Sequence, residues 1–368
     1  MKTFNLKEAI RLLAMTVMIS GAFVACSDDD DEVKLPENTV AEQGVFVFNS
    51  GNQGKSVEGS LSFIDLKNNK VLNDAFKTIN GRSLGMTVQD GVVLGDNLYI
   101  AVSESNTIEV VNKYTLESVK QIQPTDEQGS SPRDIVSDGK YVYVSMYSGH
   151  VSRINPSTNT IDKTVAVGPN PEQMAIANGY LYVVNSDGMN WSANYANGKS
   201  VSKVNTSSMT EEKKIEIGLN PTCIGADNAG NLLALCMGNY YDVPATIWKI
   251  DSSDNATDTG IEGTIMTISG NSLYIINAPW GATTVTYAKY NTTTMAPTSS
   301  NFVSQPVDSP AGIAVDPDNG SIYITSYNLV DGYASYSTPG YVAEYSSDGT
   351  FVKEHEVGTG AVNMTIMK

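Results

Sequence analysis

The stretch Val45-Phe46-Val47-Phe48-Asn49 recurs along the chain and decides the fold. Each copy is a short run of branched or aromatic residues between apolar neighbours, which favours a strand buried on both faces. The later copies follow at intervals of roughly 40 to 50 residues: LYIAV from Leu98, VYVSM from Val142, LYVVN from Leu181, LLALC from Leu232, LYIIN from Leu273 and IYITS from Ile322. Seven copies at this spacing predict a seven-bladed β-propeller.

The third repeat shows what one unit contains. Turn residues such as Asp138-Gly139 separate short apolar runs, because glycine tolerates the positive φ that tight hairpins need. The strands expected in this repeat are 131–136, 141–146, 149–155 and 160–167. Four antiparallel strands make one blade, and a lone blade cannot bury both of its faces. The expected fold is therefore an all-β ring of four-stranded blades.

Prolines and the two chain ends indicate how the ring is built. A Ser-Pro or Asn-Pro pair opens several repeats, and proline is tolerated as the first residue of a strand; these prolines are Pro132, Pro171, Pro221 and Pro310. The first repeat begins at its second strand, at Gly44, whereas residues 361–367 are left over after the last repeat. We expect this C-terminal strand to complete blade one, which removes an exposed sheet edge.

The first 25 residues are expected to be a signal peptide. A positively charged start precedes an apolar run over 12–24, too short for a stable transmembrane helix. The run ends in Phe23-Val24-Ala25-Cys26, which resembles the lipobox of bacterial lipoproteins. This resemblance implies cleavage before Cys26 and lipid attached to that residue; the alternative is a free thiol.

An acidic run over 27–32 follows directly. Such a block is either a solvated linker or, after a lipidated cysteine, similar to the export tag of Bacteroidetes lipoproteins. The second interpretation implies the outer face of the outer membrane. The expected organisation is a signal peptide (1–25), a lipidated cysteine with acidic tag and tether (26–43) and a propeller (44–368).

Charge excludes one class of partner. The net charge is −17 at pH 7, with 23 lysines and arginines against 40 aspartates and glutamates. Nucleic-acid phosphates and anionic lipid headgroups need basic surfaces. We therefore expect no nucleic-acid partner, and the lipid anchor as the membrane contact.

Catalytic and metal-binding patterns are weak. His150 and His355 fall in distant repeats, and Asp251, Asp254 and Asp258 lack the ordered spacing of a calcium loop. We expect no metal, no cofactor and no catalytic residues, so the protein is not expected to be an enzyme.

Two cysteines remain besides Cys26. Cys223 and Cys236 flank a hairpin turn over 228–231, and counting outward from the turn places them opposite each other. An oxidising compartment permits a disulfide there. Strained cross-strand geometry leaves two buried thiols as the alternative.

The loops between second and third strands indicate the ligand face. In four-stranded blades these loops share one end of the ring with the connections between blades. In this chain these loops are long, and several of them carry tryptophan or tyrosine. They span 50–56, 186–199, 237–244, 278–281 and 327–340. Loops on a rigid scaffold commonly carry function, although each aromatic residue could instead only pin its loop. Trp248, within a strand, is expected to pack in the core.

With these segments in hand, the chain resembles the YncE-like surface-layer propeller lipoproteins of Bacteroidetes. The resembling segments are 44–52 with 59–62, 73–76, 80–85 and 217–222. Family members near this pattern include cobalamin-binding lipoproteins that cap the outer-membrane vitamin B12 transporter. The resemblance implies capture of a corrinoid on one propeller face and transfer to a TonB-dependent transporter. It carries over no individual contact residue.

The loop argument supplies the candidate ligand-binding residues. Aromatic side chains would cover a flat corrin ring, amides would pair with its amide fringe, and Arg82 or Arg133 would meet the phosphate of its nucleotide tail. The full set is Asn52, Gln53, Arg82, Arg133, Tyr147, Gln173, Trp191, Tyr195, Asn220, Tyr240, Tyr241, Trp280 and Tyr327. Two alternatives remain open: a surface glycan binder, which also uses aromatic platforms, and a propeller lactonase or lyase, since a fold does not determine a function.

Overall fold

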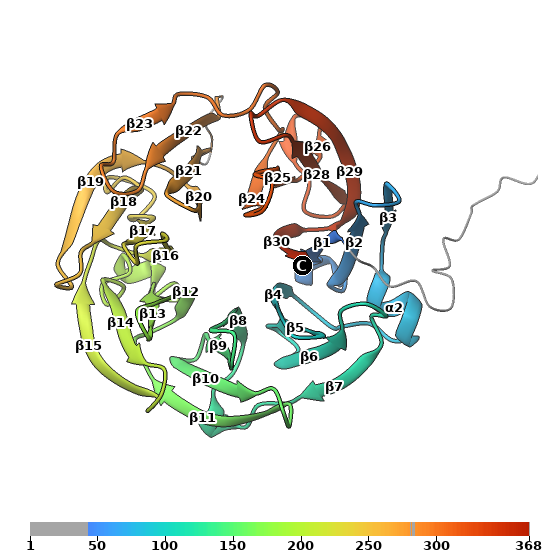
Figure 1. Ribbon diagram of the computed structural model, residues 1–368, viewed down its shortest axis with the longest axis horizontal. Coiled ribbons are helices and arrows are strands. Elements are labelled where there is room, and N and C mark those ends of the chain that lie inside the picture. Colours follow the sequence, from blue (N-terminus) through green and yellow to red (C-terminus); the bar gives the residue numbers. More distant parts are fainter. Residues whose placement is uncertain (1–42, 280, 282–283, 368) are drawn as a thin grey trace, which may run out of the picture. The chain divides into compact units, whose positions relative to one another are not determined.

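The computed structural model describes residues 43–279, 281 and 284–367, which form a ring of seven four-stranded antiparallel sheets (Figure 1). The seven-bladed propeller expected from the repeats is confirmed. From the inner strand outward, blades 1 to 3 are β30 (Ala361–Met367), β1 (Gly44–Asn49), β2 (Ser60–Asp65), β3 (Lys70–Leu72); β4 (Val88–Leu94), β5 (Asn97–Val102), β6 (Thr107–Asn112), β7 (Ser118–Ile122); and β8 (Pro132–Ser137), β9 (Val142–Met146), β10 (His150–Asn155), β11 (Thr160–Ala166).

The remaining blades follow the same order. Blades 4 to 7 are β12 (Pro171–Ala177), β13 (Tyr180–Asn185), β14 (Ser200–Asn205), β15 (Thr210–Glu216); β16 (Pro221–Ala226), β17 (Leu232–Cys236), β18 (Thr246–Ile250), β19 (Ala256–Glu262); β20 (Ile265–Ser269), β21 (Ser272–Asn277), β22 (Thr286–Asn291), β23 (Pro297–Ser299); and β24 (Pro310–Val315), β25 (Ile322–Ser326), β28 (Pro339–Tyr345), β29 (Phe351–Thr359). A two-stranded hairpin, β26 (Leu329–Val330) and β27 (Tyr333–Ala334), extends from blade 7.

The C-terminal strand closes the ring as expected. β30 is the inner strand of blade 1 and pairs with β1, with Val45 opposite Ile366 and Phe46 opposite Thr365. The first and last strands of the described chain therefore share one sheet. This arrangement removes the two free edges that an open ring would leave.

The hydrophobic cores lie between neighbouring blades. One of them joins blades 4 and 5, where Tyr182 and Val184 pack with Ala234 and Cys236, and Trp248 packs against its margin. The recurring apolar stretch supplies these cores, because the second strands of the blades, such as β1, β9, β17 and β25, are buried along almost their whole length. Each blade needs its neighbours to cover its faces, as the repeat argument required.

Proline does mark the beginning of inner strands: β8, β12, β16 and β24 each start with Pro. Directly after these prolines the register with the second strand shifts, for example between Pro221 and Cys223. Such a bulge adds one residue to one strand of a pair. The expected opposition of Cys223 and Cys236 is therefore wrong: Cys236 lies opposite Pro221, and Cys223 lies opposite Leu235.

Both of these cysteines are free thiols. Burial raises the pKa of Cys223 to about 12 and raises that of Cys236 as well. Because the thiolate is the reactive form, we expect neither thiol to react with an aromatic disulfide reagent in the native protein at pH 8. Both should react after unfolding in guanidinium, and a reducing agent should leave Tm unchanged. A drop in Tm on reduction would contradict the free-thiol assignment.

Short helices occur in the connections. They are α2 (Ala75–Asn80), η1 (Gln53–Lys55), η2 (Asp126–Gln128) and η3 (Trp191–Ala193). Within the described ranges, no helix has the length and apolarity needed to cross a bilayer. The signal peptide, Cys26, the acidic run and the tether up to residue 42 lie outside the described residues, as does Trp280.

Candidate functional site

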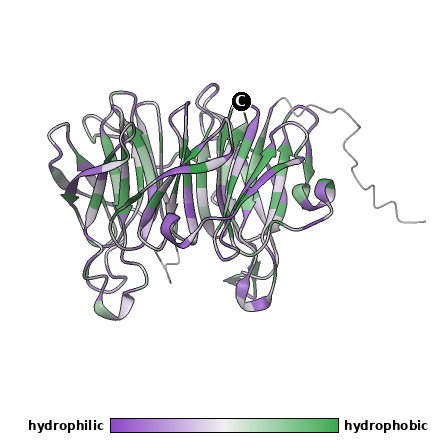
Figure 2. Ribbon diagram, turned by 90° about the horizontal axis from the view of Figure 1, so that it is seen from below, coloured by the Kyte–Doolittle hydropathy of each residue, from purple (hydrophilic) through white to green (hydrophobic). Residues whose placement is uncertain are grey.

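Two groups of long loops project from one end of the ring, which we call the loop face (Figure 2). The inner strands begin at this end and the second strands finish there, with Pro171 opposite Asn185 and Pro310 opposite Ser326. We call residues 186–199 and 237–244 the blade 4–5 lobe, and residues 327–338 the blade 7 lobe. The loops after the second strands therefore lie at the same end of the ring as the connections that enter the inner strands, as expected from the sequence.

The blade 4–5 lobe presents aromatic side chains on a braced base. The rings of Tyr195 and Tyr240 meet edge to face with centroids 6.1 Å apart. The backbone of buried Asn220 ties the two loops together, because its N–H donates to the Gly198 carbonyl at 2.6 Å and its carbonyl accepts from the Met237 N–H at 2.8 Å. Burial raises the pKa of the Tyr240 phenol. Trp191, in η3, is 71% exposed and Tyr241 is 93% exposed. The Trp191 and Tyr241 rings are therefore free for contact. The Tyr195 and Tyr240 rings contact each other, and Tyr240 is also 62% exposed.

The blade 7 lobe has the same design. The rings of Tyr327 and Tyr336 lie 4.7 Å apart, and burial raises the pKa of Tyr327 to about 12. Asn52 Nδ2 donates to the Tyr336 carbonyl at 2.6 Å, which ties the blade 1 loop to this lobe. Tyr333 on the hairpin is 80% exposed. Leu329 and Val330, on the adjacent hairpin strand, are also exposed.

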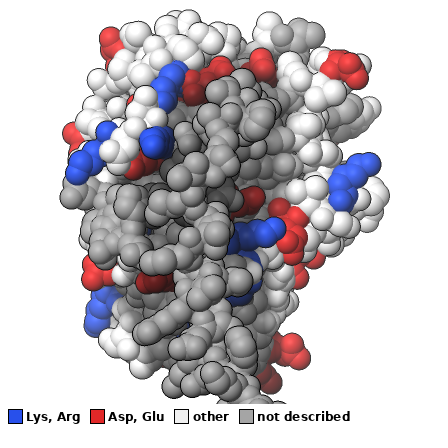
Figure 3. Space-filling model, turned by 90° about the vertical axis from the view of Figure 1, so that its right-hand side faces the viewer, with Lys and Arg blue, Asp and Glu red and all other residues white. Residues whose placement is uncertain are grey.

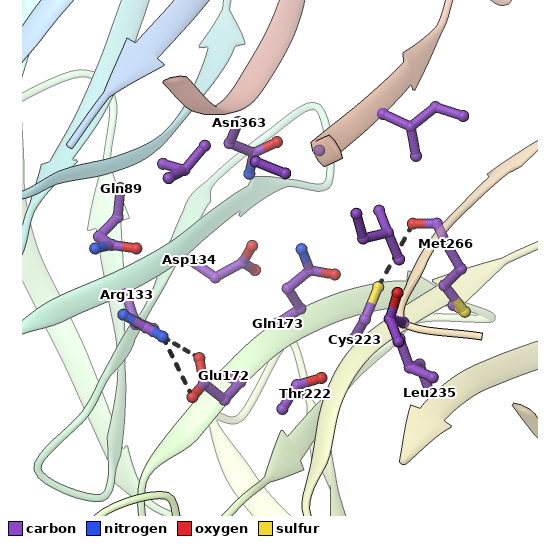
Figure 4. Close-up of a pocket in the computed structure, with 16 residues that line it drawn as sticks. Gln89, Arg133, Asp134, Glu172, Gln173, Thr222, Cys223, Leu235, Met266 and Asn363 are labelled. Carbon is purple, nitrogen blue, oxygen red and sulfur yellow. Dashed lines mark hydrogen bonds and ion pairs between the residues drawn. The ribbon is translucent and has the colours of Figure 1, made fainter. Parts of the chain in front are cut away.

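A cavity of about 240 Å³ lies at the mouth of the central channel, formed by the first residues of the inner strands (Figure 4). The inner strands of several blades contribute one or more side chains each. The lining residues are Gln89, Arg133, Asp134, Glu172, Gln173, Thr222, Cys223, Leu235, Thr264, Ile265, Met266, Ala311, Gly312, Ile313, Val362 and Asn363. Since inner strands begin at the loop face, the cavity lies at the same end as both lobes.

An ion pair forms one wall of the cavity. Arg133 Nε donates to Glu172 Oε2 at 2.6 Å, and the guanidinium lies over the Tyr147 ring, 5.1 Å from its centroid. Burial alone would lower the pKa of Arg133, but the charge and hydrogen bond of Glu172, together with the nearby Tyr147 and Asp134, outweigh burial and the pKa is raised. Burial also raises the pKa of the Tyr147 phenol. Arg133 is thus held in its charged form by a carboxylate that already neutralises it.

Two buried carboxyls, Asp90 and Asp134, stand beside this pair and hydrogen-bond to each other. Asp90 accepts from Asn363 Nδ2 at 2.8 Å and from the Ile135 backbone N–H at 3.1 Å. Asp134 accepts from the Met174 backbone N–H at 2.9 Å. These bonds link blades 1, 2, 3 and 4 around the channel.

Burial shifts both titrations. It raises the pKa of Asp90 to about 6. Burial, followed by repulsion from Asp90, raises the pKa of Asp134 well above its usual value. Two adjacent carboxyls in a low-dielectric site cannot both ionise cheaply, so the pair shares one proton near neutral pH.

The candidate residues from the sequence fall into three places. Arg133, Tyr147 and Gln173 meet at the channel mouth. The lobes hold most of the others, namely Trp191, Tyr195, Tyr240, Tyr241 and Tyr327, with Asn52 and Asn220 bracing their bases. Gln53 is exposed on the blade 1 loop and donates to Glu104 in blade 2.

Arg82 lies apart from these groups. Its guanidinium pairs with Glu109 at 2.7 Å and with Ser118, and it covers the Phe76 ring. Glu109 is fully buried, so this cation serves to neutralise it. A role for Arg82 with a ligand phosphate stays an untested prediction, and its geometry disfavours that role.

We therefore expect Arg82→Met to lower the free energy of unfolding by about 1–2 kcal/mol, because Glu109 loses its charged partner while keeping hydrogen bonds from Ser118 and Gln121. Ligand affinity should not change. Urea denaturation and calorimetric titration check the two parts separately. A loss of affinity without a loss of stability would return Arg82 to the ligand site.

Two residues of the cavity lining, Gln89 and Asp134, were not among the candidates. They occupy the second and third positions of inner strands, as do Arg133 and Gln173. Aligning the inner strands of the repeats on their first residues would have found them. The long loops instead supplied most of the candidates, and the inner strands supplied only Arg133 and Gln173.

Other sequence expectations concern absences. Among residues 43–279, 281 and 284–367, no three His, Cys, Asp or Glu side chains are grouped so as to hold a metal ion. His355 is buried and bonds to Glu344 at 2.7 Å, distant in the sequence from His150. On the side shown in Figure 3, lysines and arginines are interspersed with acidic residues. The absence of a nucleic-acid partner and of catalysis stay predictions.

Comparisons with known proteins place the fold and the family. No curated protein sequence matches the chain. Among solved structures, the hydrazine synthase of Kuenenia stuttgartiensis superposes with a TM-score of 0.54 at 14% identity, covering 91% of this chain and 100% of that one. At this identity the likeness supports the fold alone. The family described as "Domain of unknown function (DUF5074)" matches residues 43–360, and the chain therefore belongs to that family.

Proposed function

We propose that this protein is a surface-exposed outer-membrane lipoprotein that captures a corrinoid of the vitamin B12 type on its loop face. It would then pass the ligand to a TonB-dependent outer-membrane transporter. The observation that carries the proposal is the presence of exposed aromatic lobes and a polar channel mouth at the same end of one rigid ring. The proposed role is binding and transfer, without a chemical reaction or a cofactor.

The ligand chemistry matches these two kinds of surface. A corrin ring is flat and apolar and carries amide groups around its edge. Exposed Trp191, Tyr241 and Tyr333 offer large rigid contact areas at a low cost in side-chain entropy. Each lobe contains a pair of tyrosine rings in edge-to-face contact, so little ordering would be needed on binding.

The position of the chain start is compatible with surface display. Gly44 pairs with Met367 at the end of the ring opposite to the loop face. A lipid on Cys26 would therefore attach through a tether that enters at the far end, leaving the loop face open to ligand. A strongly acidic body would be held at the membrane by its lipid rather than by basic side chains.

A surface glycan binder is the second candidate. Exposed Trp191 and Tyr241 would also suit stacking on sugar rings, and the amides and carboxylates near them would suit hydroxyl groups. This alternative predicts binding of oligosaccharides and none of corrinoids.

Calorimetric titration of the full-length protein in mild detergent with cyanocobalamin, and a glycan array run in parallel, separate the candidates. Submicromolar, one-to-one binding of cyanocobalamin with a blank array supports the proposal. Glycan signals with no heat from cyanocobalamin would replace it with the second candidate. Membrane fractionation and co-purification of a TonB-dependent transporter from crosslinked cells test the location and the partner.

A further inference from the structure

We infer that the cavity at the mouth of the central channel is a subsite for a neutral primary carboxamide. This inference rests on the proposed function, because the edge of a corrinoid supplies such groups. It assigns a part of the ligand to residues of the inner strands, distinct from the aromatic lobes. It also states which charge the subsite rejects.

Three polar side chains in the cavity have no hydrogen-bond partner among the residues that the structure describes. Gln89, Gln173 and Thr222 line the cavity, and none of their side chains makes a hydrogen bond to another described residue. Figure 4 shows the two glutamines extending into the space between the inner strands. Side-chain amides that a fold leaves unpaired at a cavity wall can bind a ligand amide through one donor and one acceptor each. The side chain of neighbouring Asn363, in contrast, donates to Asp90 and accepts from the Met364 backbone N–H.

The charges around the cavity reject anions. Glu172, Asp134 and Asp90 are all buried at or beside its wall, against one cation, Arg133. That cation is already bound to Glu172 at 2.6 Å. With one proton shared by the two aspartates, the group still carries a net negative charge. A carboxylate or phosphate entering the cavity would be desolvated against it, which is unfavourable.

A neutral amide avoids this desolvation cost, and it can form hydrogen bonds both to the carboxylates and to the glutamine amides. Its N–H can donate to a carboxylate such as Glu172, and its carbonyl can accept from Gln89 or Gln173. Hydrogen bonds to charged acceptors are the stronger ones. The phosphate of a nucleotide tail would accordingly lie outside the cavity, and Arg133 would orient Glu172 rather than bind phosphate.

The size of the cavity limits what can enter. Its volume of about 240 Å³ is below the 300–1,000 Å³ typical of pockets that enclose a whole small-molecule ligand. It has room for a short side chain that ends in an amide, and a corrin ring would stay above it, between the lobes. Recognition would thus combine apolar contacts above with hydrogen bonds below.

The first test removes the free amides while keeping their volume. Full-length protein with Gln89→Leu and Gln173→Leu together should bind cobinamide, which has amide side chains and no nucleotide tail, at least tenfold more weakly than wild type. Since neither side chain makes a hydrogen bond to another described residue, Tm should not change. Gln305→Leu is the matched control, because Gln305 is exposed in the connection before β24 and lies outside the cavity lining. Its affinity should equal that of wild type.

The second test changes the ligand. Cobyrinic acid has the same ring with carboxylates in place of the amides, and it should bind at least tenfold more weakly than cobinamide even in 0.5 M salt, where long-range repulsion is screened. Equal affinity of the two ligands, or an unaffected glutamine variant, would overturn the subsite while corrinoid capture stood. No binding of cobinamide or cyanocobalamin to wild type would overturn the proposed function itself.

Discussion

Replacing Trp191 and Tyr241 with alanine is expected to weaken cyanocobalamin binding by at least 100-fold. Both side chains are mostly exposed at the tip of the blade 4–5 lobe, so the loss would come from ligand contacts rather than from unfolding. Truncation of an aromatic anchor at an interface commonly costs 2 kcal/mol or more, and two such anchors give an effect of this size. The pair Tyr333→Ala and Tyr336→Ala in the blade 7 lobe tests whether the ligand bridges both lobes.

Calorimetric titration measures this effect, and thermal unfolding confirms that each variant is folded. Val119→Ala and Val352→Ala are suitable controls, because both valines are about half exposed on outer strands. They should leave affinity unchanged. If the Trp191 and Tyr241 variant retained wild-type affinity, the loop face would not be the binding surface.

Asp134→Asn is expected to stabilise the protein at pH 8 and to flatten the dependence of its stability on pH. In wild type the pKa of Asp90 rises from 3.8 to about 6 because of burial. The folded state therefore holds protons more tightly than the unfolded state, and stability is lost as pH rises from about 4 through 6. Burial and repulsion from Asp90 raise the pKa of Asp134 as well, and this is the contribution that an asparagine at position 134 removes.

An asparagine at position 134 would keep the geometry and remove the charge conflict. Its oxygen can accept from the Met174 N–H as the carboxylate does, and its amide can donate to Asp90. Guanidinium denaturation at pH 4, 6 and 8 should show the variant and wild type converging at pH 4 and diverging above it. A variant less stable than wild type at pH 8 would show that both carboxyls are needed in ionised form.

Asp348→Asn is the matched control for this series. Asp348 is exposed, and hydrogen bonds from Ser346 and Thr350 lower its pKa. A lowered pKa reverses the sign, since the stability it contributes is lost as pH falls rather than as pH rises. The Asp348→Asn control should therefore show no gain in the free energy of unfolding at pH 8, whereas Asp134→Asn should show one.

The architecture could be predicted because each repeat carries its own signal. A run such as Val45–Phe48 is apolar at every position, which only a strand covered on both faces tolerates. The prolines at 132, 171, 221 and 310 begin inner strands because a first residue loses no ladder bond. The strand left over at 361–367 predicted closure of the ring, because the first repeat lacked its inner strand.

The register of one hairpin could not be predicted in this way. Counting from the turn assumed a regular ladder between Cys223 and Cys236, whereas the bulge after Pro221 moves them out of opposition. The register shifts after each of the four strand-initial prolines, but from the sequence a proline indicates only where the strand begins and not that a residue is added there. The thiols remain unbonded as a result.

Sequence by itself determined the number of blades, the strands of each and the end of the ring that bears the aromatic loops, because these follow from local patterns that repeat. Only the tertiary structure decided which side chains meet at the axis. Gln89, Asp134 and Gln173 come from three blades, so their proximity depends on closure of the ring. It likewise decided that Arg82 and Arg133 are neutralised by Glu109 and Glu172, since an ion pair between blades is set by packing and leaves no signature in either segment alone.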